Sequence, residues 1–154
     1  MLLASGMCRT RELEASGCKV GIGVDGSASN DSSNMMQELR HALFLGRLRY
    51  GAEQVSHMDV LRWATSGSAR CLNRHDIGEI AVGKQADLAF FLLDELRFSG
   101  AGDPLAALVL CGAHSADKVM VGGRWVVEDG KPVGIDIARL RHEHGVAAKA
   151  FLAS

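Results

Sequence analysis

The sequence has no excess of charge of either sign. Seventeen Lys and Arg residues stand against eighteen Asp and Glu residues, which gives a net charge of −1 over 154 residues. No basic cluster stands out along the chain. Because proteins hold nucleic acids mainly through contacts of Lys and Arg with phosphates, we expect no nucleic-acid partner.

Cysteine is scarce and scattered. The chain has four cysteines, none of them in a C-x-x-C pair. Their wide spacing argues against a disulfide framework and against a structural zinc knuckle. We therefore expect free, buried thiols in a reducing compartment. The four residues are Cys8, Cys18, Cys71 and Cys111.

Long apolar runs are also missing. The longest, near Leu88–Leu93 and Leu105–Cys111, fall well short of the ~20 residues that a membrane helix needs. The first residues lack the basic region and the sustained apolar stretch of a signal peptide. We therefore expect a cytoplasmic protein with no membrane partner.

The sequence does contain enough apolar residues for a folded core. Hydrophobic residues make up 47% and charged residues 23%, close to ordinary globular values. In the first half we expect a short helix at Thr10–Ala15 and then a buried strand at Lys19–Val24, where β-branched residues alternate with glycine. Two helices follow, beginning at the capping-box patterns Asn34–Gln37 and Ser56–Asp59. The second is expected to continue to Leu72.

The second half has a β texture that ends in a helix. We expect a strand at Asp87–Leu93 and a helix that starts at Asp103-Pro104. A hairpin is expected at Lys118–Val127, because its Gly122-Gly123 pair supplies the positive φ of a tight turn. An amphipathic helix follows from Ile137. One strand–helix unit cannot close a parallel sheet, so this set of elements is incomplete for an isolated domain.

Asp25 is the strongest candidate for chemistry. It lies where the expected strand gives way to a loop rich in Gly and Ser. In α/β barrels, side chains at the carboxyl ends of strands line the active site, where a carboxylate can hold a metal or move protons. The alternative is that Asp25 only begins a turn, since Asp-Gly is a common turn pair.

Other patterns give weaker signals. Gly21–Gly26 matches G-x-G-x-x-G, but no helix opens at the third glycine as a dinucleotide site requires. His142 and His144 are two residues apart in an expected helix, so they point in different directions and favour a solvated face over a metal pair. Met35 and Met36 are expected in the core, near the Asp25 loop. The isolated histidines are expected at the surface or hydrogen-bonded: His41, His57, His75 and His114.

Three stretches resemble the amidohydrolase superfamily. Val20–Asp31 is similar to its last barrel strand, Ile77–Leu88 to its return into a small β-sandwich domain, and Val119–Gly130 to its final hairpin. The nearest subgroup is that of the cytosine, guanine and chlorotriazine aminohydrolases. Within it, Asp94–Ala113 most resembles the branch that deaminates 8-oxoguanine. The resemblance covers essentially the whole chain and is more specific for the superfamily than for the substrate.

This resemblance implies an α/β fold that is one part of a larger one. Residues 1–75 would form the C-terminal portion of the (β/α)8 barrel of a metal-dependent hydrolase, with its last strand and the helices that follow. Residues 76–135 would supply the C-terminal strands of the small β-sandwich domain. Residues 136–154 would form a C-terminal helix.

The resemblance also implies a chemistry. Family members deaminate purine-like aminated heterocycles, here of the 8-oxoguanine type, by means of zinc-activated water, and Asp25 would bind or neighbour the zinc and shuttle the proton. The family's other ligands, a His-x-His pair and two further histidines on earlier strands, have no counterpart here. Since catalytic zinc usually has three protein ligands, we expect a C-terminal fragment that is inactive alone and homo-oligomeric when full length. The substrate-binding residues are unknown.

Two other interpretations stay open. The chain could come from a different enzyme on the same scaffold, a hydroxytriazine-type aminohydrolase. It could also be an intact small protein that has kept the fold for a non-catalytic interaction.

Overall fold

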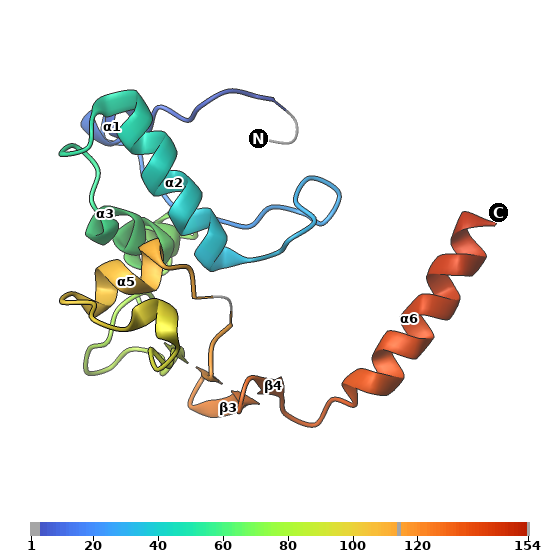
Figure 1. Ribbon diagram of the computed structural model, residues 1–154. Helices are drawn as coiled ribbons and strands as arrows, with labels where there is room; N and C mark the ends of the chain where they lie inside the picture. Colours follow the sequence, from blue (N-terminus) through green and yellow to red (C-terminus); the bar gives the residue numbers. More distant parts are fainter. Residues whose placement is uncertain (1–3, 114, 154) are drawn as a thin grey trace.

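Helices dominate the first half of the chain, and a small sheet and a long helix make up most of the rest. The computed structural model describes residues 4–113 and 115–153. Figure 1 shows α1, α2, α3 and α5 gathered together, with the strands below them and α6 standing to one side. In chain order the elements are α1 (Thr10–Ala15), α2 (Met35–Tyr50), α3 (His57–Arg62), the π-helix η1 (Trp63–Gly67), α4 (Ser68–Cys71), β1 (Leu88–Phe90), the 3-10 helix η2 (Leu96–Phe98), α5 (Pro104–Leu110), β2 (Lys118–Val121), β3 (Arg124–Glu128), β4 (Lys131–Pro132) and α6 (Ile137–Leu152).

Three helices begin at the side-chain caps that the sequence predicted. Asn34 Oδ1 accepts a hydrogen bond from the backbone N–H of Gln37 at 3.1 Å, and α2 starts there. At α3 the capping box is reciprocal, because Ser56 and Asp59 each accept from the other's backbone N–H. At α5, Asp103 Oδ1 accepts from the backbone N–H groups of Leu105 and Ala106. Each cap satisfies N–H groups that a helix start leaves without a partner.

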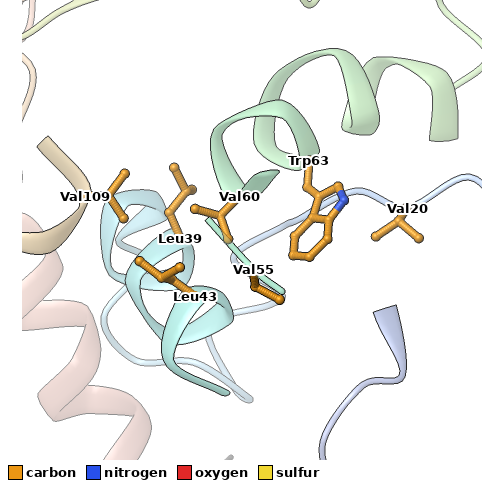
Figure 2. Close-up of a cluster of buried hydrophobic side chains, with 7 residues drawn as sticks. All are labelled: Val20, Leu39, Leu43, Val55, Val60, Trp63 and Val109. Atoms are coloured by element: carbon orange, nitrogen blue, oxygen red, sulfur yellow. The ribbon is translucent and has the colours of Figure 1, made fainter. Parts of the chain in front are cut away.

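The core lies between α2, α3, η1 and α5. Figure 2 shows its seven buried side chains, which come from these elements, from the loop between α2 and α3, and from the segment before Asp25. Trp63 is the largest, with 1% of its surface exposed. The other six are Val20, Leu39, Leu43, Val55, Val60 and Val109. Because Val20 belongs to this cluster, the core fixes one end of the segment that leads to Asp25.

The sheet is antiparallel, in the order β1-β2-β3-β4. Its β2–β3 hairpin turns at Gly122 and Gly123, which have φ values of 55° and 79°, so the predicted Gly-Gly turn is confirmed. Across the sheet, the rings of Phe90 and Trp125 lie 5.7 Å apart between centroids. The predicted strand at residues 87–93 is shorter than expected, because beyond Phe90 the chain packs against a second buried cluster around Phe98.

Three expectations need correction. Lys19–Val24 is not a strand, and only Val20 in it is buried; a strand needs a neighbour for its ladder, and no strand lies beside it among the described residues. The helix expected to run from residue 57 to Leu72 is interrupted by η1. All four cysteines are free, as predicted, but they are exposed and not buried.

The helix α6 forms as predicted but buries none of its residues. Its Asp136 cap accepts from the N–H of Arg139 at 3.0 Å. His142 and His144 are both exposed on it. None of the helices in the described ranges combines the length and the apolar content that a bilayer crossing requires.

Candidate functional site

Asp25 stands at the end of a segment that has left the core. Its φ of 66° is left-handed, a conformation that Asp tolerates better than most residues. One carboxylate oxygen, Oδ1, accepts from the N–H of Gly26 at 2.8 Å. Both Ser29 and Asn30 then donate to the carbonyl of Gly26, which closes a turn. Asp25 therefore does begin a turn, and its side chain is exposed.

The same residue also lines a cavity of about 580 Å³. Its walls come from the stretch before α1, from residues 22–32 and from one side of α2. The turn interpretation and the functional interpretation of Asp25 are thus compatible, since the turn presents the carboxylate to the cavity. Asp31, six residues further along the loop, lines the same cavity.

Two residues that the sequence left aside also line this cavity. Glu38 and His41 lie three positions apart on α2, half-buried, and residues at that spacing share one face of a helix. Asn30 Nδ2 donates to Glu38 Oε1 at 2.7 Å, which ties the Asp25 loop to α2. The signal that could have found them is this helical spacing next to the loop. Met35 and Met36 pack against the core, as expected.

The chain's own residues do not complete a zinc site. No three His, Cys, Asp or Glu residues within the described ranges are grouped closely enough to hold a metal ion. Asp25 offers one carboxylate of a suitable kind, whereas catalytic zinc usually takes three protein ligands. His57 Nε2 lies 3.2 Å from Asp103 Oδ2, and the exposed His142 and His144 take no part in such a group.

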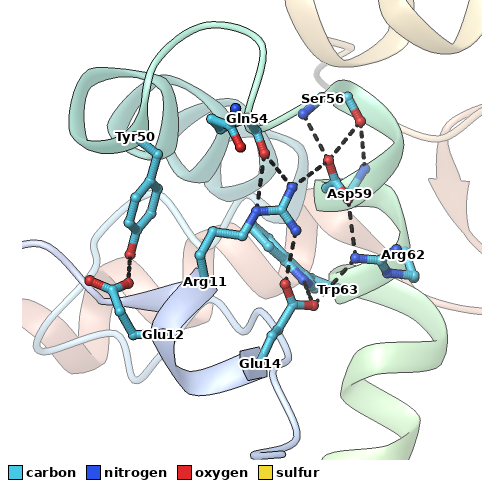
Figure 3. Close-up of polar contacts among 9 residues, drawn as sticks. All are labelled: Arg11, Glu12, Glu14, Tyr50, Gln54, Ser56, Asp59, Arg62 and Trp63. Carbon is cyan, nitrogen blue, oxygen red and sulfur yellow. Dashed lines mark hydrogen bonds and ion pairs between the residues drawn. The ribbon is translucent and has the colours of Figure 1, made fainter. Parts of the chain in front are cut away.

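A network of charged side chains fastens α1 to the helices behind the site (Figure 3). Arg11 of α1 bonds to Glu14 at 2.9 Å and to Asp59 of α3 at 3.0 Å. Glu14 also accepts from the indole Nε1 of Trp63 at 2.7 Å. Because α1 immediately precedes the segment that carries Asp25, this network fixes where that segment starts.

The network also holds its carboxylates in the charged form. Burial alone would favour the neutral acid, but hydrogen bonds from Trp63 and Arg11 keep the pKa of Glu14 below its ordinary value. Burial also raises the pKa of Asp59, but the hydrogen bonds from Ser56 and the charge of Arg11 outweigh it. The pKa of Asp59 is therefore below its ordinary value. At the far end of α1, a hydrogen bond from the Tyr50 hydroxyl lowers the pKa of Glu12 to about 2.

Known proteins share this sequence and this fold. The sequence model of the Amidohydrolase family matches residues 1–126. The chain is 63% identical over 153 residues to 8-oxoguanine deaminase from Pseudomonas aeruginosa, a match that covers 99% of this chain and 34% of that protein.

Solved structures of related enzymes share the fold of this chain. One is atrazine chlorohydrolase from Arthrobacter aurescens, complexed with zinc. The match covers 92% of this chain and 32% of that protein, with a TM-score of 0.85 and 36% sequence identity. Another is an adenosine deaminase from Xanthomonas campestris with bound zinc. This match covers 99% of this chain and 35% of that protein, with a TM-score of 0.89 and 31% sequence identity.

The chain spans about a third of the length of these relatives. Their backbones follow the described helices and strands closely enough to confirm the predicted fold class, the C-terminal part of a metal-dependent hydrolase barrel with strands of the smaller domain. The match of the family model extends from the stretch before α1 into β3, the second strand of the hairpin. This chain belongs to the amidohydrolase family.

Proposed function

We propose that this chain is the C-terminal portion of a zinc-dependent aminohydrolase that deaminates a purine-like aminated heterocycle of the 8-oxoguanine type. The observation that carries the proposal is the 63% identity to 8-oxoguanine deaminase along nearly the whole chain. In this proposal, residues 1–75 belong to the barrel, residues 76–135 to the small β-sandwich domain and residues 136–154 to a terminal helix.

Asp25 is the residue that we propose for the chemistry. Its carboxylate faces the cavity, and among the described residues it has no ion-pair partner. A carboxylate in that state can accept a proton from a reacting group or contribute one ligand to a metal. The remaining ligands are not supplied by the described residues, so we propose that they come from the barrel portion that the relatives have in addition.

The proposal predicts that the isolated chain is inactive. Purified chain should release no ammonia from 8-oxoguanine and should hold no stoichiometric zinc after dialysis, because a single carboxylate cannot retain the ion. Ammonia assay and metal analysis test this directly. Turnover by the isolated chain, or one tightly held zinc per chain, would show that this chain holds a complete zinc site. That result would contradict the proposal.

A graft tests the role of Asp25. In the Pseudomonas aeruginosa deaminase, this chain replaces the matching C-terminal third, and kcat/KM for 8-oxoguanine is measured. Asp25→Asn keeps size and shape but removes the charge and the proton acceptor, so it should lower kcat/KM by roughly a hundredfold to ten-thousandfold. Thermal unfolding of the same samples reports whether the fold is intact.

The matched control is Asp31→Asn, the same change in the same cavity wall. It should lower kcat/KM much less than Asp25→Asn does, because in this proposal Asp31 only shapes the loop and takes no part in the chemistry. Near-normal turnover of Asp25→Asn would make Asp25 a turn residue only. A graft that prefers a hydroxytriazine to 8-oxoguanine would favour the other enzyme class.

A further inference from the structure

One serine side chain takes the place of a neighbouring strand beside the Asp25 segment. Ser68 Oγ accepts from the backbone N–H of Ile22 at 3.1 Å and lies 2.9 Å from the carbonyl oxygen of Ile22. The same Oγ lies 2.9 Å from the carbonyl oxygen of Trp63. A hydroxyl has one proton and can accept twice, so it donates to one of these two carbonyls. Whichever carbonyl receives the proton, the backbone N–H of Ile22 finds its acceptor in this side chain.

The backbones are packed tightly around this serine. A Cβ added to Gly21 would lie 2.8 Å from the Cα of Ser68, and one added to Gly67 would lie 2.4 Å from the carbonyl oxygen of Val20. Atoms that close would force the chains apart. The two glycines, one on each side, therefore allow the segment and η1 to approach until the hydroxyl of Ser68 reaches Ile22.

The π-helix brings Ser68 into place. Here η1 ends at Gly67, and α4 begins at Ser68. Such wide turns are rare and occur often at functional sites. Ser68 is the first residue after the irregular turn, and its half-buried side chain points back to Trp63 and across to Ile22. The π-helix η1 therefore ends directly before the residue that makes the hydrogen bond to Ile22.

Asp25 follows Ile22 by three residues, a reach of at most about 10 Å for an extended chain. Between them, Gly23 and Val24 make no hydrogen bond to the rest of the described chain. The bond of Gly26 to Asp25 is local and does not fix the segment in space. On its N-terminal side, the position of the Asp25 carboxylate therefore depends on the anchor at Ile22. On its C-terminal side, the bond of Asn30 to Glu38 ties the loop to α2.

We propose that Ser68 is a positioning residue for Asp25, and that it acts by holding Ile22 through its hydroxyl group. The proposal rests on the role assigned to Asp25 above. Ser68 does not line the cavity, so it acts on substrate turnover only through the segment it holds. Its loss should change how well the carboxylate is placed and not how tightly substrate binds.

The first test uses the 154-residue chain itself. Amide hydrogen exchange of Ile22 is measured by NMR in the unmodified chain, in Ser68→Ala and in Ser66→Ala. Ser66 is the matched control, because it lies in the same π-turn and its side chain makes no hydrogen bond to any described residue. Ser68→Ala should speed the exchange of Ile22 by at least about fivefold, which corresponds to the loss of a bond worth roughly 1 kcal/mol. Equal exchange in the two variants would overturn the proposal.

The second test uses the graft onto the Pseudomonas aeruginosa deaminase. Ser68→Ala should lower kcat by about tenfold to a hundredfold, the range expected for a small misplacement of a reacting group, and leave KM close to that of Ser66→Ala. A kcat equal to the control's would show that Ser68 is only structural, as would a loss of kcat that merely follows the folded fraction. If Asp25→Asn is fully active, the role proposed for Asp25 fails even when the exchange at Ile22 behaves as expected.

Discussion

Removing the Glu14 carboxylate should be one of the most costly surface changes in this protein. Trp63 lies in the core with 1% of its surface exposed, and its indole N–H finds its acceptor in Glu14. Glu14→Ala would leave this N–H without that partner, at a cost of about 1–3 kcal/mol. Arg11 and Arg62, with 31% and 46% of their side-chain surfaces exposed, regain water, so losing their ion pairs adds at most about 1 kcal/mol.

A second variant separates the contribution of the indole hydrogen bond from that of the ion pairs. Glu14→Gln keeps an amide oxygen that can accept from Trp63 but removes the charge. It should cost about 1 kcal/mol or less, whereas Glu14→Ala should cost about 1–4 kcal/mol, the sum of both terms. The difference between the two variants then reports the buried indole bond alone.

The assay is urea unfolding followed by tryptophan fluorescence, which reports on Trp63 in the core and on Trp125 in the sheet. With slopes of about 1–3 kcal/mol per molar urea, Glu14→Ala should lower the midpoint by roughly 0.3–4 M. Glu143→Ala is the control, an exposed acid of α6 with a single partner on its own helix, and should shift stability by no more than about 0.5 kcal/mol. If Glu14→Ala behaved like this control, the indole bond would contribute nothing and the reasoning would be wrong.

Two further outcomes are expected. Leu43→Ala should lower the free energy of unfolding by about 2–5 kcal/mol because the side chain is fully buried, while Leu48→Ala on the same helix, 76% exposed, should stay within about 0.5 kcal/mol; equal urea midpoints would contradict this. The pKa values of Glu12, Glu14 and Asp59 are all lowered, so their stabilising effect is complete above the unfolded values and is lost as pH falls through the folded ones. The pKa of Glu12 falls from 4.5 to about 2. Glu12→Gln should therefore reduce the loss of unfolding free energy as the pH falls between these two values. An unchanged dependence of the unfolding free energy on pH, measured by urea titrations, would refute the role of Glu12.

Local signals in the sequence were enough for the helices and the hairpin. The caps at Asn34, Ser56 and Asp103 are each made by a side chain and an N–H two or three residues away. The turn at Gly122-Gly123 depends only on the conformational freedom of glycine. Interactions of such short range can be inferred from a few neighbouring letters, and these elements begin where they were predicted to begin.

Long-range features could not be predicted in the same way. The apolar alternation of Lys19–Val24 predicted a strand, but a strand is defined by its partner, and Ile22 is held by a side chain 46 residues away. The interruption of the helix at Trp63–Gly67 likewise leaves no periodicity signal. For the site, Asp25 could be picked out from its place before a loop, whereas Glu38 and His41 needed the packing of α2 beside that loop. The role of Asp25 in catalysis stays a prediction.

The distance along the chain between Ile22 and Ser68 also sets an order of events during synthesis. The two residues are 46 positions apart, and a ribosome adds about 5–20 residues per second, so Ser68 is made roughly 2–9 s after Ile22. During that interval Asp25 already exists, but the side chain that anchors its segment does not. If Ser68 positions Asp25 as proposed, the carboxylate reaches its final place only after η1 and α4 have formed. The placement of Asp25 is then a late step, although the residue itself is made early.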